Sequence, residues 1–293
     1  MRHLISIASI TTRTIWELME PEHPGLSLVK NGNALKFIRG PIALMFHEPS
    51  TRTKFSFMQA ALNTGITPLD FNAANSSEVK GESLLDSCRN LAWMGVKAFV
   101  IRTSQNGLPG EVSLKLEGVS IINAGDGTHE HPTQALGDAR TLRDHFGRID
   151  GLKIAIVGDI EHSRVARSDA HLLSRLGAQI NLVGSFCPED IPRHLSTTSL
   201  EEGLANVDAV IVLRHQSERW APGNSASKMG TSLGEEHIAR YAKPNCVVMH
   251  PGPINRGVEV TPELIGGPRS LVQKQVENGV RARTRVLQWM LEA

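Results

Sequence analysis

Residues 46–55, FHEPSTRTKF, concentrate anion-binding chemistry in one short stretch of the chain. An apolar run ends at Phe46, and Pro49 followed by Ser50 is typical of a helix start with Ser50 as N-cap. The first turn of that helix would offer backbone N–H groups, two threonine hydroxyls, a guanidinium group and the positive end of the helix dipole. The sequence therefore predicts a phosphate site without a glycine-rich loop, formed by Ser50, Thr51, Arg52 and Thr53. The alternative is a capped helix with an exposed arginine.

Residues 125–134, GDGTHEHPTQ, follow another apolar run and open a helical segment, which is where α/β sheets bind ligands. His131 can donate a hydrogen bond to a carbonyl oxygen, and Gln134 can hold an amide group. A metal site formed by His129, Glu130 and His131 is the competing interpretation. Neighbouring loop residues rarely converge on one ion, so we expect no metal here.

The second half of the chain supplies two arginines at the ends of apolar runs. Arg164 follows residues 153–157 and can bind a carboxylate bidentately. Arg214 and Gln216 follow residues 208–213, and two guanidinium groups suit a dicarboxylate better than a cationic amino acid. Residues 158–164, GDIEHSR, do not match GxGxxG, so a nucleotide-dependent oxidoreductase has little support and no cofactor is expected.

The elements that must position these residues alternate along the chain. Short, nearly continuous apolar runs are typical of strands buried on both faces of a parallel sheet, and they occupy residues 42–46, 98–101, 120–123, 153–157, 179–183, 208–213 and 246–250. Helical stripes lie between them, at Phe55, Met58 and Leu62 and at Leu84, Cys88, Leu91 and Met94. Alternating strands and helices predict an α/β fold.

Other segments connect or cover these elements. Residues 133–147 predict a helix that ends at Gly147, and residues 272–290 predict a last helix despite Gly279 inside it. Residues 220–234 are rich in Gly and Ser and predict a long loop that can act as a lid. Pro251 and Pro253 flank Gly252 and predict a stiff turn that presents its backbone carbonyls.

The composition and the length of the chain exclude several classes of protein. The 293 residues carry 31 Lys plus Arg and 30 Asp plus Glu, a net charge of +1 that gives no global field for nucleic acid or an anionic membrane. The length allows two cores. Three scattered cysteines argue against a disulfide framework or structural zinc. Without an apolar run of roughly 20 residues or a signal-like start, we expect a soluble cytoplasmic protein that does not bind membranes.

Five segments together resemble the aspartate/ornithine carbamoyltransferase family in order and spacing over nearly the whole chain. They are STRT at 50–53, SSEVKGES at 76–83, HPTQ at 131–134, LRHQSER at 213–219 and HPGP at 250–253. The resemblance implies an α/β fold of two doubly wound parallel-sheet domains with an interdomain active-site cleft. Residues 1–135 would bind carbamoyl phosphate, with the helix at 272–293 packing back on them, and residues 150–271 would bind aspartate.

The resemblance also implies roles for single residues. It assigns carbamoyl phosphate to Ser50, Thr51, Arg52, Thr53, Arg102, His131, Gln134, Pro251, Gly252 and Pro253, and among these it gives catalytic roles to Arg52, Thr53, Arg102 and His131. It assigns aspartate to Lys80, Arg164, Arg214 and Gln216. Ser76 and Lys80 would reach into the site of a neighbouring subunit, which implies a homotrimer.

The choice of the second substrate follows from two of the segments. Residues 214–219, RHQSER, fit the Arg-x-Gln-x-Glu-Arg pattern of the aspartate branch, and HPGP lacks the cysteine of the ornithine branch. The expected reaction converts carbamoyl phosphate and L-aspartate into N-carbamoyl-L-aspartate and phosphate, an early step of pyrimidine biosynthesis. Ornithine or another amino acid as acceptor, or a non-catalytic trimeric scaffold, are the alternatives. A larger assembly with regulatory or dihydroorotase chains is a further candidate partnership.

Overall fold

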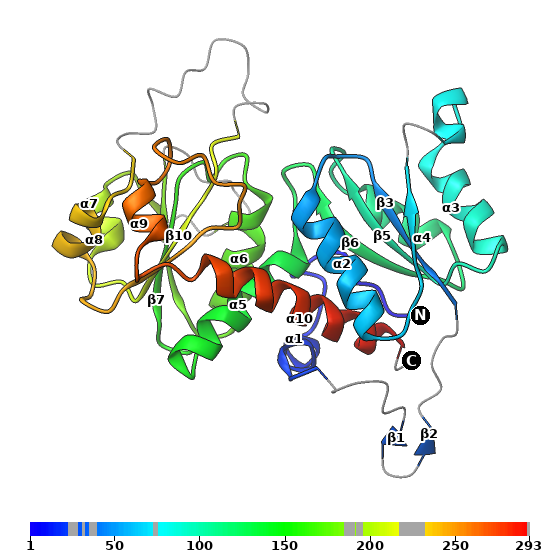
Figure 1. Ribbon diagram of the computed structural model, residues 1–293, viewed down its shortest axis with the longest axis horizontal. Helices are drawn as coiled ribbons and strands as arrows, with labels where there is room; N and C mark the ends of the chain where they lie inside the picture. The colour runs from blue at the N-terminus through cyan, green and yellow to red at the C-terminus, as the bar shows by residue number, and fades with distance from the viewer. Residues whose placement is uncertain are drawn as a thin grey trace. The chain divides into compact units, whose positions relative to one another are not determined.

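The computed structural model describes residues 1–22, 29–30, 33–34, 40–72, 76–184, 191, 196–216 and 232–291 (Figure 1). The chain divides into two compact units, Met1–Gly137 with Asn278–Ala293, and Asp138–Glu277. Residues 217–231 lie outside the described part of the chain, and with them most of the predicted lid at 220–234. No helix among the described residues is long and apolar enough to cross a membrane.

The first unit contains a four-stranded parallel sheet in the order β4-β3-β5-β6. Its strands are β3 (Ile42–Phe46), β4 (Pro68–Phe71), β5 (Ala98–Thr103) and β6 (Ser120–Asp126). The helices of this unit are α1 (Thr12–Met19), α2 (Thr51–Asn63), η2 (Ser77–Lys80), α3 (Leu84–Trp93) and α4 (Leu108–Lys115), and β1 (Val29–Lys30) pairs with β2 (Asn33–Ala34) separately. Side chains of α3 and α4 share one apolar cluster with β3, β5 and β6. The predicted strands are confirmed, whereas the half-exposed edge strand β4 carried no apolar signal.

Helix α2 buries a different face from the one that its apolar spacing predicts. The helix that Phe55, Met58 and Leu62 indicated is confirmed, but Phe55 and Leu62 are 64% and 63% exposed and do not face the core. The residues that α2 buries are Thr53, Phe57, Ala60 and Ala61. Both alanines are fully buried, and the Arg283 guanidinium covers the Phe57 ring at 5.3 Å. In α3 the prediction holds for buried Cys88, but Met94 lies beyond the helix end and is 78% exposed.

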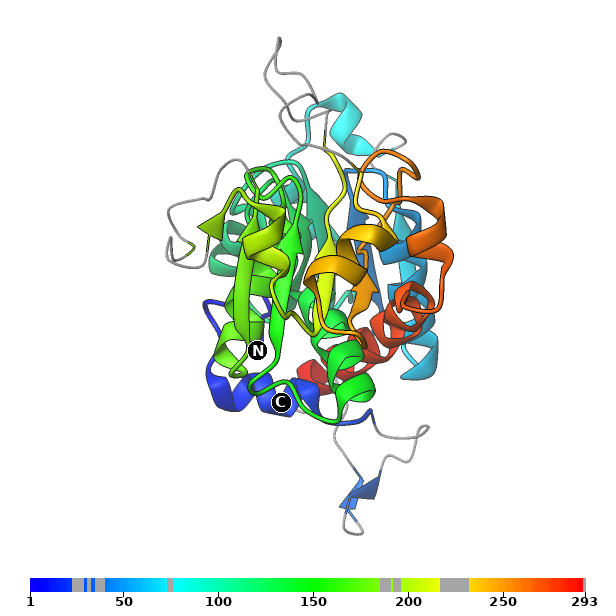
Figure 2. The ribbon, with the colours of Figure 1, turned by 90° about the vertical axis from the view of Figure 1, so that its left-hand side faces the viewer.

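The second unit contains a five-stranded parallel sheet in the order β11-β10-β7-β8-β9 (Figure 2). Its strands are β7 (Lys153–Val157), β8 (Gln179–Val183), β9 (Ser196–Thr197), β10 (Ala209–Val212) and β11 (Val247–Met249). Helices α7 (Leu200–Leu204), α8 (Glu235–Tyr241) and α9 (Pro262–Gly266) share one apolar cluster with this sheet. Helix α6 (Arg164–Arg175) packs along β8, and Figure 1 shows it on the opposite side of the sheet from α7 and α8.

Both sheets reverse their strand order where polar loops begin. In the first sheet the chain runs from β3 outward to β4 and then returns to β5 on the other side of β3. In the second sheet it runs from β7 to β8 and β9 and then returns to β10 beside β7. Loops diverge at such switch points and leave a crevice outside the carboxyl ends of the strands. The motif at 47–53 follows β3, and the motif at 158–164 follows β7. Each motif therefore comes directly after the strand beside which the strand order reverses.

Two long helices complete the structure. Helix α5 (Pro132–Phe146) ends at Gly147, whose φ of 73° is the left-handed conformation expected of a C-terminal glycine. Helix α10 (Val272–Leu291) runs through Gly279 as predicted, and a Cβ added at Gly137 of α5 would lie 3.2 Å from the Gly279 Cα. Gly279 therefore stands inside a helix because two backbones approach each other there.

Substitution of Gly137 tests this close approach. We expect Gly137→Ala to lower the free energy of unfolding by about 1–3 kcal/mol, because the added methyl group meets backbone that cannot move aside. Urea denaturation measures the change. The matched control is Gly266→Ala, where the nearest atom to an added Cβ is 3.8 Å away. Equal stability of the Gly137→Ala and wild-type proteins would contradict the packing described here.

Candidate functional site

The start of α2 carries the predicted phosphate segment. Ser50 is the N-cap, as predicted, with extended backbone (φ −162°), but its side chain makes no capping hydrogen bond to the helix. The first turn contains no acidic residue that would repel an anion. Thr51 and Arg52 are exposed, and Thr53 is buried. A helix start without a side-chain cap, next to hydroxyls and a guanidinium group, is suited to bind phosphate.

Arg102 is fixed beside this segment. It is the last residue but one of β5, and its Nη1 donates to the Ala124 carbonyl at 3.2 Å. Its Nε lies 3.5 Å from the Glu48 carboxylate, and its backbone carbonyl accepts from the His47 N–H at 2.9 Å. Arg102 is thereby tied both to β6 and to the loop that leads into α2. The contact of Arg102 with Glu48 was not predicted, because the sequence alone does not give the order of the strands in the sheet.

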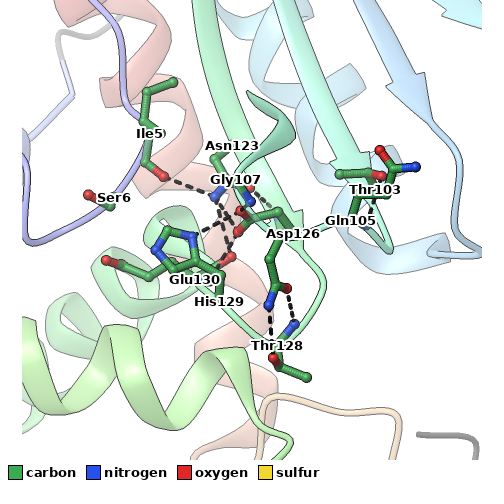
Figure 3. A network of polar contacts seen from close by, with 12 residues as sticks. Ile5, Ser6, Thr103, Gln105, Gly107, Asn123, Asp126, Thr128, His129 and Glu130 are labelled. Carbon is green, nitrogen blue, oxygen red and sulfur yellow. Dashed lines mark hydrogen bonds and ion pairs between the residues drawn. The ribbon is translucent and has the colours of Figure 1, made fainter. Parts of the chain in front are cut away.

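The loop that leads to His131 is built around a buried carboxylate (Figure 3). Asp126 is fully buried and accepts hydrogen bonds from the backbone N–H groups of Gly107 and Glu130 and from the Asn123 side chain, at 2.7, 3.0 and 2.7 Å. The Oδ2 atom of Asp126 also lies 2.9 Å from the His129 Nδ1. Burial alone would raise the pKa of Asp126, but these hydrogen bonds outweigh it and hold the pKa below its ordinary value. The carboxylate therefore stays ionised at neutral pH.

Glu130 connects the same loop to the N-terminal segment. Its Oε2 accepts from the Ile7 backbone N–H at 2.8 Å, and the Asn123 side chain donates to the Ile5 carbonyl at 2.9 Å. His131 follows, 4% exposed, with its carbonyl accepting from the Gln134 N–H at the start of α5. The described residues contain no group of three or more His, Cys, Asp or Glu able to hold a metal ion. His129 contacts Asp126, and Glu130 accepts from the Ile7 N–H, so both side chains hold the loop.

In the second unit, Asp159 joins the loops that follow β7 and β10. Its two carboxylate oxygens accept from His162 Nδ1 at 2.7 Å and from the Gln216 backbone N–H at 3.2 Å. The Gln216 side-chain amide donates to the His162 carbonyl at 3.1 Å, so this contact ties Gln216 to the neighbouring loop. Arg164 is the first residue of α6 and is 6% exposed, and half-exposed Arg214 belongs to the loop that Asp159 holds.

The predicted stiff turn at 251–253 has a hydrogen-bonded base that the sequence did not reveal. The Gly252 backbone N–H donates to His250 Nδ1 at 2.8 Å, so the ring proton is on Nε2, which lies 3.1 Å from the Glu259 carboxylate. Glu259 also accepts from the Asn255 N–H at 2.6 Å. Burial would raise the pKa of Glu259, but His250 and the backbone donors outweigh it and lower that pKa. The turn thus rests on a buried, ionised carboxylate.

Ser76 and Lys80 lie at a distance in sequence from the other site residues, on and next to the short helix η2. Ser76 is its N-cap and accepts from the Glu78 N–H at 3.2 Å, and Lys80 is exposed. Glu78 Oε2 lies 2.7 Å from His47 Nε2. That contact brings the segment of Ser76 and Lys80 to the loop between β3 and α2.

Comparison with known proteins places the chain in a family. Residues 2–144 match the family model of the aspartate/ornithine carbamoyltransferase carbamoyl-phosphate-binding domain, and residues 150–290 match that of the aspartate/ornithine-binding domain. The chain therefore belongs to the aspartate/ornithine carbamoyltransferase family, a family of transferase enzymes.

The chain is also similar to individual members of this family. The chain is 46% identical to the aspartate carbamoyltransferase catalytic subunit of Thermus thermophilus over 85% of this chain and 84% of that protein. It is 41% identical to that of Salinispora arenicola over 99% and 98%. Among solved structures, aspartate transcarbamoylase from Trypanosoma cruzi with carbamoyl phosphate and aspartate has a TM-score of 0.82 and 27% identity, over 100% and 97% of the two chains. Ornithine carbamoyltransferase from Pyrococcus furiosus has a TM-score of 0.83 and 25% identity, over 98% and 96%.

Substitution of Asp126 tests the base of the His131 loop. We expect Asp126→Asn to lower the free energy of unfolding by about 1–3 kcal/mol at pH 7, because an amide group would face hydrogen-bond donors. The stabilisation from a carboxylate of lowered pKa is present above its ordinary value of 3.8 and is lost as the pH falls through the folded-state value. The difference in the free energy of unfolding between the wild-type and Asp126→Asn proteins should therefore become smaller as the pH falls below 3.8. Urea denaturation of both proteins across the acid range measures it, and a constant difference would refute the assignment.

Proposed function

We propose that this protein transfers the carbamoyl group of carbamoyl phosphate to L-aspartate, giving N-carbamoyl-L-aspartate and phosphate. The observation that carries the choice of aspartate is the pair Arg164 and Arg214 at the switch point of the second sheet. Asp159 ties together the loops that carry them. Two guanidinium groups match the two carboxylates of aspartate, and ornithine offers only one carboxylate. The relatives named aspartate carbamoyltransferase support the same choice.

The first unit is proposed to bind carbamoyl phosphate. Ser50, Thr51, Arg52 and Thr53 surround the phosphate at the start of α2, where backbone N–H groups and the helix dipole favour a dianion. Gln134 holds the carbamoyl amide. From the second unit, the carbonyls of Pro251 and Gly252 accept from the carbamoyl NH₂, and Pro253 lies next to them.

The amine of aspartate attacks the carbamoyl carbon and forms a tetrahedral intermediate with a negative oxygen. Thr53, Arg102 and His131 donate to that oxygen, and one such donor is worth about 3 kcal/mol in the transition state. The carbon–phosphate-oxygen bond then breaks, and phosphate leaves with both electrons of that bond. The departing phosphate accepts the proton from the amine, so no protein base is needed. Correct orientation of two bound substrates supplies the other large contribution.

The proposal includes a cytoplasmic homotrimer in which Ser76 and Lys80 complete the site of a neighbouring subunit and Lys80 contacts aspartate. Large apolar side chains of the first unit remain exposed in the single chain, among them Trp93 at 91%. Burial of such side chains against another copy would be favourable. Buried Cys88 and Cys246 are free thiols, which is compatible with a reducing compartment. The reaction would serve pyrimidine biosynthesis.

A carbamoyl-transfer assay with aspartate and ornithine side by side tests the substrate. We expect turnover with aspartate and at least about 100-fold less with ornithine, because the second guanidinium would face a cationic side chain. Measurement of the oligomer size on the same sample tests the trimer. Turnover with ornithine alone would overturn the choice of acceptor, and no transfer to either would support the non-catalytic alternative.

Two variants test the phosphate segment and the shared site together. Arg52→Ala and Lys80→Ala should each lower kcat/KM by about 100-fold or more, since each removes a charge that contacts substrate in the proposal. Mixed after subunit exchange, they should regain activity, because some sites then combine an intact Arg52 with an intact Lys80 from another subunit. Mass spectrometry confirms the exchange. Full activity of either variant, or no recovery in verified hybrids, would contradict the assignment.

A further inference from the structure

The segment that carries Ser76 and Lys80 has little structure of its own. Helix η2 is a single turn of four residues, and such a turn is not stable by itself. Ser77, Val79 and Lys80 are exposed, and η2 buries no residue fully. Glu78 differs from these neighbours, because its side chain is only 14% exposed. The position of Lys80 therefore depends on what Glu78 contacts.

Glu78 contacts a residue that comes 31 positions earlier in the chain. Its Oε2 lies 2.7 Å from Nε2 of His47, whose side chain is 21% exposed. The negative charge of Glu78 also reaches α3, where burial first and Glu78 second raise the pKa of the Cys88 thiol to about 12. A partly desolvated hydrogen bond of this kind between an imidazole and a carboxylate is stronger than an exposed surface pair.

The two partners differ in how firmly the rest of the fold holds them. The His47 N–H donates to the Arg102 carbonyl at 2.9 Å, which extends the pairing of β3 with β5, and the His47 ring lies 6.2 Å from that of Phe71 in β4. His47 is thus an extension of the sheet, three residues before the Ser50 N-cap. Loss of the contact would release the exposed turn and leave the strand end in place.

We propose that Glu78 is a positioning residue that fixes the Ser76–Lys80 segment on the sheet through His47, so that the Lys80 ammonium can reach bound substrate. The inference rests on the proposed function, in which this segment completes the site of a neighbouring subunit. Glu78 then acts on that neighbouring site, although it lies beside the phosphate segment of its own chain. The prediction is therefore that its loss is repaired in trans.

The first experiment compares single variants in the carbamoyl-transfer assay. Glu78→Ala should lower kcat/KM at least tenfold, with oligomer size and melting temperature close to wild type. Glu78→Gln should recover much of the loss, because its amide oxygen still accepts from the His47 ring. Glu111→Ala, which removes an exposed carboxylate of α4, should leave activity unchanged. Should Glu78→Ala fail to fold, His47→Ala removes the same contact from the other partner and provides the same test. Wild-type activity of the Glu78→Ala enzyme would overturn the inference.

The second experiment uses mixed oligomers. Glu78→Ala subunits mixed with Arg52→Ala subunits should regain activity, because some sites combine an intact phosphate segment with an intact Lys80 segment. Glu78→Ala mixed with Lys80→Ala should not recover, since both parents lack a working Lys80 segment. The reverse pattern would show that Glu78 serves its own phosphate segment and would overturn the inference. If the wild-type enzyme transfers the carbamoyl group to aspartate, that result overturns only the role of Glu78. If the wild-type enzyme is inactive, the proposed function itself is refuted.

Discussion

Buried carboxylates that accept backbone N–H groups hold the loops of this site. Asp126 holds the loop after β6, Asp159 the loop after β7, and Glu259 the loop after β11. A buried carboxylate is costly unless donors surround it, and the N–H groups of a loop lose their water when the loop folds over a strand end. The carboxylate accepts the hydrogen bonds that the loop N–H groups need, and these N–H groups offset the cost of burying the charge. The folded loop and the buried carboxylate therefore stabilise each other. The rest of the site depends on this mutual requirement.

Rigid loops matter because the proposed chemistry relies on donors placed in advance. No covalent intermediate on the protein is invoked, so the catalytic contribution comes from orientation and from charges that already face the developing oxyanion and phosphate. Arg102 is an example, since Ala124, Glu48 and the pairing with His47 fix its place before any substrate binds. The lowered pKa values of Asp126 and Glu259 keep these supports ionised throughout the neutral range.

The two units repeat the same construction with different side chains. Each places its candidate binding residues after the first strand of a doubly wound sheet and after the strand that returns beside it. In the first unit a helix start follows β3 and presents hydroxyls and Arg52, which suit a phosphate. In the second unit a buried arginine opens the helix after β7, which suits a carboxylate. The chemistry differs because the side chains at equivalent strand ends differ.

The sequence by itself determined the α/β class and the positions of the buried strands, and it supplied the candidate site residues, which stay predictions. Apolar runs and motifs such as STRT are local features, so the amino-acid sequence alone is sufficient to find them. Only the tertiary structure decided which partner each polar group has. It showed that Ser50 is an N-cap without a capping hydrogen bond, that α2 leaves Phe55 and Leu62 exposed, and that Asp126 lies at the centre of a loop. The contact of Glu78 with His47 was equally hidden, because partners 31 residues apart meet only once the strands are ordered within a sheet.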